Sequence, residues 1–141
     1  MKSGYIDSSF LLSIIFEDNN YYESVDIWNT LDVFLGSVFL EIECRINIYK
    51  YLITQKKDKK SYRKKEEELT ELLKHINRKT IDEEISLEIR NHEKLKRLKS
   101  LDSIHLATAN IFNKLINGKV LVCSYDRNMI TISKEMGMDI I

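Results

Sequence analysis

Apolar and polar residues follow one another along this chain in blocks of strand and helix length. The short segment 2–6 ends in the apolar pair Tyr5-Ile6, directly before Asp7, and an apolar stretch with helical spacing follows at 8–16. The run 120–123 is apolar without interruption, as in a parallel strand buried on both faces. We expect strands at 2–6, 32–35, 80–81, 120–123 and 138–141, and helices at 8–16, 22–31, 38–53, 63–76, 82–92, 100–115 and 127–135. Strands that alternate with helices predict an α/β fold, a parallel sheet with helices on both faces.

Helical spacing also predicts which side of two long helices is buried. The stripe in 38–53 is Val38, Ile42, Ile46, Tyr49 and Ile53, and the stripe in 100–115 is Leu101, His105, Ala109 and Phe112. Turns are expected at Gly36-Ser37 and in the Lys-rich stretch before 63, and Gly118 is expected to end the helix before it. Among inward-facing apolar neighbours, His105 is interpreted as a core histidine.

Length and composition limit the class of protein. With 141 residues the chain fits one domain, and 43% apolar residues is ordinary for a globular protein. No stretch approaches the roughly 20 apolar residues of a membrane span, and the first four residues leave no room for a signal peptide. Cys44 and Cys123 form no disulfide or metal pattern and are expected to be buried thiols. A cytoplasmic protein is the expectation.

The charges balance overall but are unevenly distributed. The chain has 22 basic and 22 acidic residues, so its net charge indicates no partner. Seven basic residues and one acid lie between Lys56 and Lys65, and a second basic group lies at 94–99. Such clusters can follow nucleic-acid phosphates or can simply be solvated helix faces.

Four acids fall at junctions between the expected elements. Asp7 and Asp126 follow strands, Asp102 lies in the first turn of a helix, and Glu43 lies early in helix 38–53. Each alone could cap a helix, face its positive dipole or be solvated. In a parallel sheet, however, strand ends and helix starts share one edge, where clustered carboxylates suit a hard ion such as Mg²⁺ or Mn²⁺. Glu41 is a rival to Glu43, because the two lie roughly 200° apart on a helix and only one can face that edge.

Four segments resemble those of the PIN-domain nucleases, in particular the VapC-type toxins of type II toxin–antitoxin systems. Segment 5–9 (YIDSS) is similar to the opening strand with its Asp, and 37–45 (SVFLEIECR) to the segment with the catalytic Glu. Segment 101–109 (LDSIHLATA) is the most specific match, and 124–127 (SYDR) resembles the fourth motif. Order and spacing agree along essentially the whole chain.

The resemblance implies a single PIN domain over 1–141, with a three-layer α/β/α fold and a mostly parallel central sheet. It implies an endoribonuclease that needs Mg²⁺ or Mn²⁺ and hydrolyses RNA phosphodiester bonds with metal-activated water. It also implies an antitoxin partner and a homodimer. The residues that match its acidic site are Asp7, Glu43, Asp102 and Asp126, with Ser9 and Ser124 as supporting hydroxyls. Spacing from Ser37 favours Glu43 over Glu41 within this resemblance.

The basic residues have no motif in the family. As candidates for RNA phosphates we name Lys56, Lys57, Lys59, Lys60, Arg63, Lys96 and Arg97. The alternative function is a catalytically silent PIN-like module that binds RNA or protein. Four retained acids argue against it, because a binding module has no use for carboxylates that repel one another.

Overall fold

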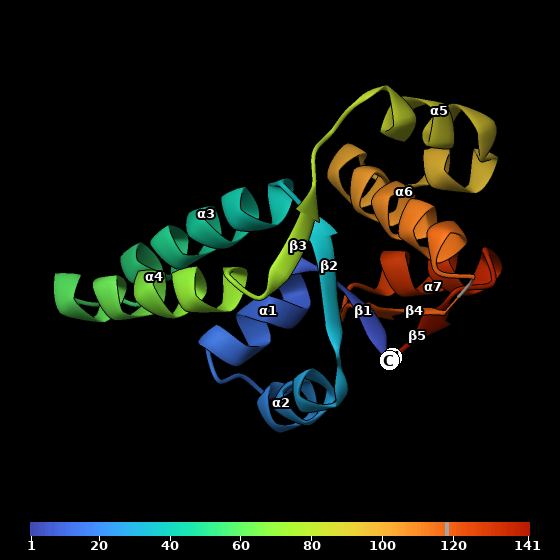
Figure 1. The fold of residues 1–141 in the computed structure, drawn as a ribbon. Helices are drawn as coiled ribbons and strands as arrows, with labels where there is room; N and C mark the ends of the chain where they lie inside the picture. The colour runs from blue at the N-terminus through green and yellow to red at the C-terminus, as the bar shows by residue number, and fades with distance from the viewer. Residues whose placement is uncertain (118) are drawn as a thin grey trace.

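The computed structural model describes residues 1–117 and 119–141 and arranges them in three layers (Figure 1). The central sheet has five strands in the order β3-β2-β1-β4-β5. They are β1 (Ser3–Ile6), β2 (Val33–Ser37), β3 (Ile76–Lys79), β4 (Val120–Cys123) and β5 (Asp139–Ile140). The pairings that join them are all parallel, which confirms the expected α/β class.

Two separate cores cover the two faces of this sheet. One core is built with residues of α1 (Ser8–Ile15), α3 (Phe39–Thr54) and α4 (Lys59–Leu73), with α2 (Tyr21–Thr30) packed at its margin. The other is built with α5 (Glu83–Asn91), the 3₁₀ helix η1 (Glu93–Arg97), α6 (Ser100–Leu115) and α7 (Arg127–Glu135). Within the described part of the chain, no helix is long and apolar enough to cross a membrane.

Neighbouring residues of the central strands point into opposite cores, because side chains alternate across a sheet. Tyr5 and Val122 belong to the core under α6, whereas Ile6 and Cys123 belong to the core under α1 and α3. All of β1 is buried. The short apolar runs in the sequence are therefore central strands covered on both faces, as predicted.

Two strand predictions were wrong in position. The third strand runs over Ile76–Lys79, not 80–81, and β2 continues through Gly36 and Ser37, which we had expected to turn. The polar run Asn77–Lys79 hid a strand because β3 lies at the edge of the sheet and exposes these side chains in part. Gly118 lies outside the described residues.

Helices α3 and α4 pack side by side and project from the sheet as an arm (Figure 1). We expected a Lys-rich turn up to residue 62, but α4 already begins at Lys59. The Asp58 carboxylate caps it by accepting a hydrogen bond from the Ser61 N–H at 2.8 Å. The basic residues therefore form the tip of the arm and the first turns of α4.

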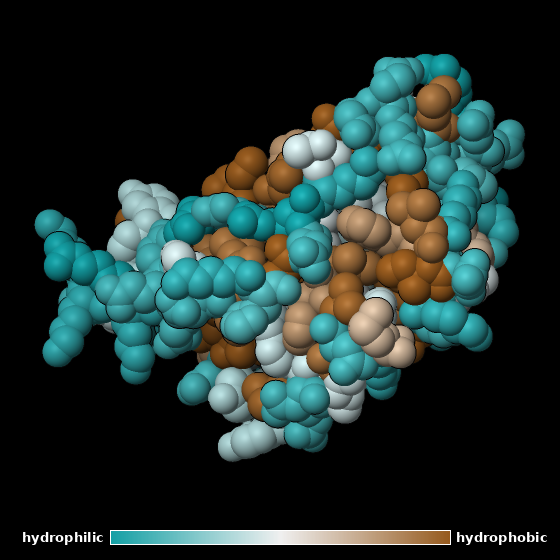
Figure 2. All heavy atoms as spheres, viewed as in Figure 1, coloured by the Kyte–Doolittle hydropathy of each residue, from teal (hydrophilic) through white to brown (hydrophobic). Residues whose placement is uncertain are grey.

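The predicted buried face of α3 was wrong. Leu40, Cys44 and Ile48 face the core, whereas Ile42, Ile46, Tyr49 and Ile53 are 49–60% exposed. Figure 2 shows apolar atoms gathered at the surface over α3. Periodicity misled because α3 carries two apolar stripes, and spacing alone does not say which one meets the sheet. Leu101 of α6, also expected inward, is 40% exposed.

Candidate functional site

Asp7 lies at the carboxyl end of the central strand, between β1 and α1. Its backbone is in the N-cap position of α1, but its side chain makes no capping hydrogen bond. Instead the carboxylate accepts hydrogen bonds from the hydroxyls of Ser9 at 2.7 Å and Ser124 at 2.8 Å, and only 4% of the residue is exposed. Capping, the simpler interpretation, therefore does not explain this acid.

The two serines join the β1–α1 junction to the β4–α7 junction. The Ser9 hydroxyl accepts the Tyr125 N–H at 2.9 Å, and the Ser124 hydroxyl accepts the Asp126 N–H at 3.1 Å. Their oxygens lie 3.3 Å apart. Because each serine accepts from the backbone and donates to Asp7, both hydroxyls hold the same carboxylate in one orientation.

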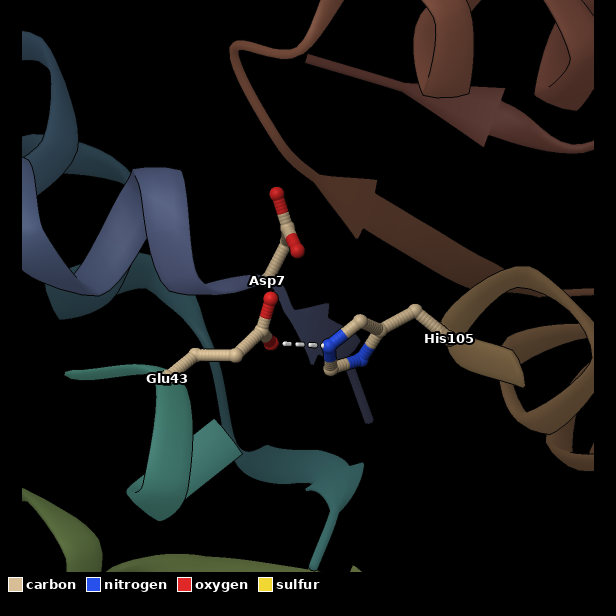
Figure 3. A group of neighbouring side chains, drawn as sticks. All are labelled: Asp7, Glu43 and His105. Atoms are coloured by element: carbon tan, nitrogen blue, oxygen red, sulfur yellow. Dashed lines mark hydrogen bonds and ion pairs between the residues drawn. The ribbon is translucent and has the colours of Figure 1, made fainter. Parts of the chain in front are cut away.

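Glu43 of α3 faces Asp7, and Glu41 does not. An oxygen of Glu43 lies in hydrogen-bond contact with Nε2 of His105, and both side chains point toward Asp7 (Figure 3). Glu41 instead accepts hydrogen bonds from Arg45 at 2.7 Å and Arg78 at 2.9 Å. Hydrogen bonds from Arg45 and then Arg78 lower the pKa of Glu41. The two glutamates thus have separate environments on opposite sides of the helix.

Three side chains come close enough to share one cation. Ligand atoms of Asp7, Glu43 and His105 all lie within 4.8 Å of one another. Bonds of about 2.1 Å to an octahedral ion place neighbouring ligand atoms about 3 Å apart and opposite ones about 4.2 Å apart. The spacing is therefore near that of a coordination shell, and carboxylate oxygens are the donors that Mg²⁺ and Mn²⁺ prefer.

Asp102 and Asp126 lie at the same edge but outside this closest group. Asp102, in the first turn of α6, is half-buried, and burial raises its pKa. Repulsion from Asp126 and then Asp7 raises it further, so the acids form one electrostatic group. One oxygen of Asp126 caps α7 by accepting the Met129 N–H at 3.0 Å. Asp126 therefore does cap α7, and its second carboxylate oxygen is left for other partners.

His105 is the residue of the site that sequence reasoning missed. It is fully buried, as a core histidine should be, but its two ring nitrogens contact Glu43 and the Tyr5 hydroxyl, the latter at 2.8 Å. Burial lowers the pKa of His105, but the hydrogen bond to Glu43 and the charges of Asp7 and Glu43 outweigh it and raise the pKa. The available signal was the spacing of three residues from Asp102, which puts both on one side of α6.

The structure does not bring the basic candidates to the acids. Five of them are exposed at the tip of the α3–α4 arm and in the first turns of α4, namely Lys56, Lys57, Lys59, Lys60 and Arg63. Glu43 lies 11 residues before the end of α3, so the tip is about 17 Å away along the helix. On η1, Arg97 pairs with Glu135 at 2.9 Å, and Lys96 is exposed.

Comparisons with known proteins agree with this architecture. A family model described as "PIN domain" matches residues 4–135, a range that includes all four acids. The fold is similar to that of a chain in a crystal structure of VapBC2 from Rickettsia felis bound to a DNA fragment from their promoter, with a TM-score of 0.64. The likeness covers 100% of this chain and 98% of that chain at 12% sequence identity. No curated protein matches the sequence.

Proposed function

Since this chain belongs to the PIN-domain family, we propose that it is a metal-dependent endoribonuclease, the VapC-type toxin of a toxin–antitoxin pair. The observation that carries the proposal is the approach of Glu43 to Asp7, whose carboxylate Ser9 and Ser124 hold in place. Carboxylates held this close repel one another, which is a cost that a cation at this place would remove. We assign the activity to a single PIN domain over residues 1–141, acting in the cytoplasm.

Asp7 and Glu43 are the residues that we assign to hold Mg²⁺ or Mn²⁺. Asp102 and the free oxygen of Asp126 complete the acidic site, directly or through water, as their shared electrostatics with Asp7 supports. When bound, such an ion lowers the pKa of a water molecule and stabilises charge that develops on a phosphoryl oxygen. Ser9 and Ser124 keep Asp7 from turning to cap α1, and so they orient it toward the ion.

We propose that the basic tip of the α3–α4 arm binds RNA phosphates away from the cleaved bond. Lys59, Lys60 and Arg63 lie in the first turns of α4, next to the positive end of its dipole. Cations there repel the helix end and one another, so a polyanion would relieve an unfavourable arrangement. Lys56, Lys57, Lys96 and Arg97 are further phosphate candidates. Such contacts fix the position of the backbone but read no base.

The proposed partners are an antitoxin and a second copy of the chain. We infer that the antitoxin blocks the acidic cleft with a basic side chain. The similarity of the fold to a chain of the VapBC2 structure supports an antitoxin as partner. For the homodimer we assign the exposed stripe of Ile42, Ile46, Tyr49 and Ile53 on α3. These residues follow one another at intervals of four, three and four, the spacing of a helix seam that two helices can share.

Mapping of RNA ends tests the enzymatic proposal. Purified protein is incubated with total RNA and Mg²⁺, and we expect discrete cuts that leave a 3′-hydroxyl and a 5′-phosphate. EDTA and Asp7→Asn should abolish them, while Asp26→Asn, a change of an exposed acid on α2, should not. Cuts that survive EDTA, or cyclic phosphate ends, would rule out the mechanism. Binding of RNA without any cut would favour a silent binding module instead.

A further inference from the structure

A buried chain of polar contacts runs from the sheet into the acidic site. The hydroxyl of Tyr5 lies 2.8 Å from Nδ1 of His105, and Nε2 of His105 contacts a carboxylate oxygen of Glu43. Both Tyr5 and His105 are fully buried, and Figure 3 shows the imidazole between α6 and Glu43. The ion site proposed above needs the carboxylates but makes no use of these two groups.

Resting on the proposed metal site, we propose that His105 is a positioning residue that holds Glu43 toward Asp7, with Tyr5 fixing the imidazole. Both ring nitrogens of His105 already have partners, so the imidazole acts through Glu43 and is not itself an ion ligand. The Glu43 oxygen that does not receive this hydrogen bond is left to face the ion together with Asp7.

Glu43 needs such support because nothing else on its own helix directs it. Ordering a glutamate side chain costs rotamer entropy, and the charge of Asp7 repels that of Glu43. Neighbouring Glu41 shows the alternative, because it turns to two arginines away from the site. A buried donor opposite Glu43 compensates both costs, since a hydrogen bond to a charged group is stronger than one between neutral groups.

Tyr5 lies on β1, and Asp7 follows two positions later, just after the end of this strand. The backbone is still extended at Asp7, and residues two apart in an extended chain point to the same face, so both side chains lie on the side of His105 and α6. A phenol both donates and accepts, so the Tyr5 hydroxyl satisfies Nδ1 whether or not that nitrogen carries a proton. The ring therefore stays in one orientation, with Nε2 toward Glu43.

Ion affinity is the test, measured by calorimetry with Mn²⁺ and Mg²⁺ and without RNA. His105→Leu removes the donor, and we expect affinity to fall 10- to 100-fold, as is typical when a residue behind a metal ligand is lost. His105→Gln restores an N–H donor at a similar reach and should recover most of the affinity. Tyr5→Phe keeps the ring packing and should lose less than His105→Leu. Ile111→Val, a buried apolar change on the same helix, should leave affinity unchanged.

Several results would overturn the proposal. Wild-type affinity in His105→Leu would show that Glu43 needs no support, and a loss not recovered by Gln would show that only packing matters. Equal losses in Ile111→Val would point to general loosening of α6. Electron spin-echo spectra of bound Mn²⁺ should lack a directly coordinated nitrogen, and its presence would make His105 a ligand. Should no RNA be cut under any condition, these ion measurements still decide the role of His105.

Discussion

Asp7→Asn separates a metal ligand from a structural acid. Asn has the same shape, and its carbonyl oxygen can keep the hydrogen bonds from Ser9 and Ser124, so the fold should survive. The change removes the charge that faces Glu43. We therefore expect the variant to differ from the wild type mainly in its response to divalent ions.

Two opposing effects set the stability of Asp7→Asn in the absence of ions. The ligand atoms of Asp7 and Glu43 lie within 4.8 Å, where two charges repel by about 1–3.5 kcal/mol for effective dielectric constants between 80 and 20. Relief of this repulsion opposes the weakening of two charge-assisted hydrogen bonds, a loss of roughly 1 kcal/mol each. Without ions, the free energy of unfolding of Asp7→Asn should thus lie within about 1.5 kcal/mol of the wild type.

Thermal unfolding in EDTA and in a series of Mg²⁺ or Mn²⁺ concentrations measures both effects. At an ion concentration of 100 times Kd, the wild type should gain about 2.7 kcal/mol, or roughly 10 °C in Tm for a chain of this size. Asp7→Asn should gain far less. A variant that is strongly destabilised in EDTA yet keeps the full ion response would refute the reasoning, because Asp7 would then be a structural acceptor and the ion would bind elsewhere.

Three further predictions concern the glutamates, the pH response and the core. Glu43→Gln should weaken ion binding in calorimetry, whereas Glu41→Gln should leave it unchanged and cost less than about 1 kcal/mol of stability, as for other exposed ion pairs. The pKa of Asp102 is raised, chiefly by burial, so protons should displace the ion at a higher pH than for an ordinary aspartate, and a calorimetric pH series should lose this step in Asp102→Asn. Gly4→Ala would place Cβ 2.6 Å from a methyl of Leu31, and urea unfolding should show a loss of roughly 1–3 kcal/mol.

Local sequence was sufficient to predict the elements whose residue pattern has a single interpretation. The unbroken apolar run that became β4 and the acid after β1 needed no tertiary information, because only a buried strand and its end explain them. The convergence of Asp7, Asp102 and Asp126 also followed from the sequence, since parallel strands bring their carboxyl ends to one edge.

Only the tertiary structure decided the orientation of α3. Helical spacing gives the angle between residues on a helix but not the direction in which the helix faces. Helix α3 carries two apolar stripes. The stripe with Leu40, Cys44 and Ile48 packs into the core, and the other is exposed at the surface. The same rotation turned Glu43 toward the acids and Glu41 toward Arg78.

The contacts of His105 likewise could not be predicted from local sequence. Its burial was predictable from its apolar neighbours, but its contact with Glu43 joins residues 62 positions apart. Such a contact exists only once α3 and α6 have packed on opposite faces of one sheet. The sequence by itself thus determined that Asp7, Asp102 and Asp126 share one edge of the sheet. The packing of the helices decided that Glu43 and His105 join them, because that contact depends on helix rotations that no local pattern records.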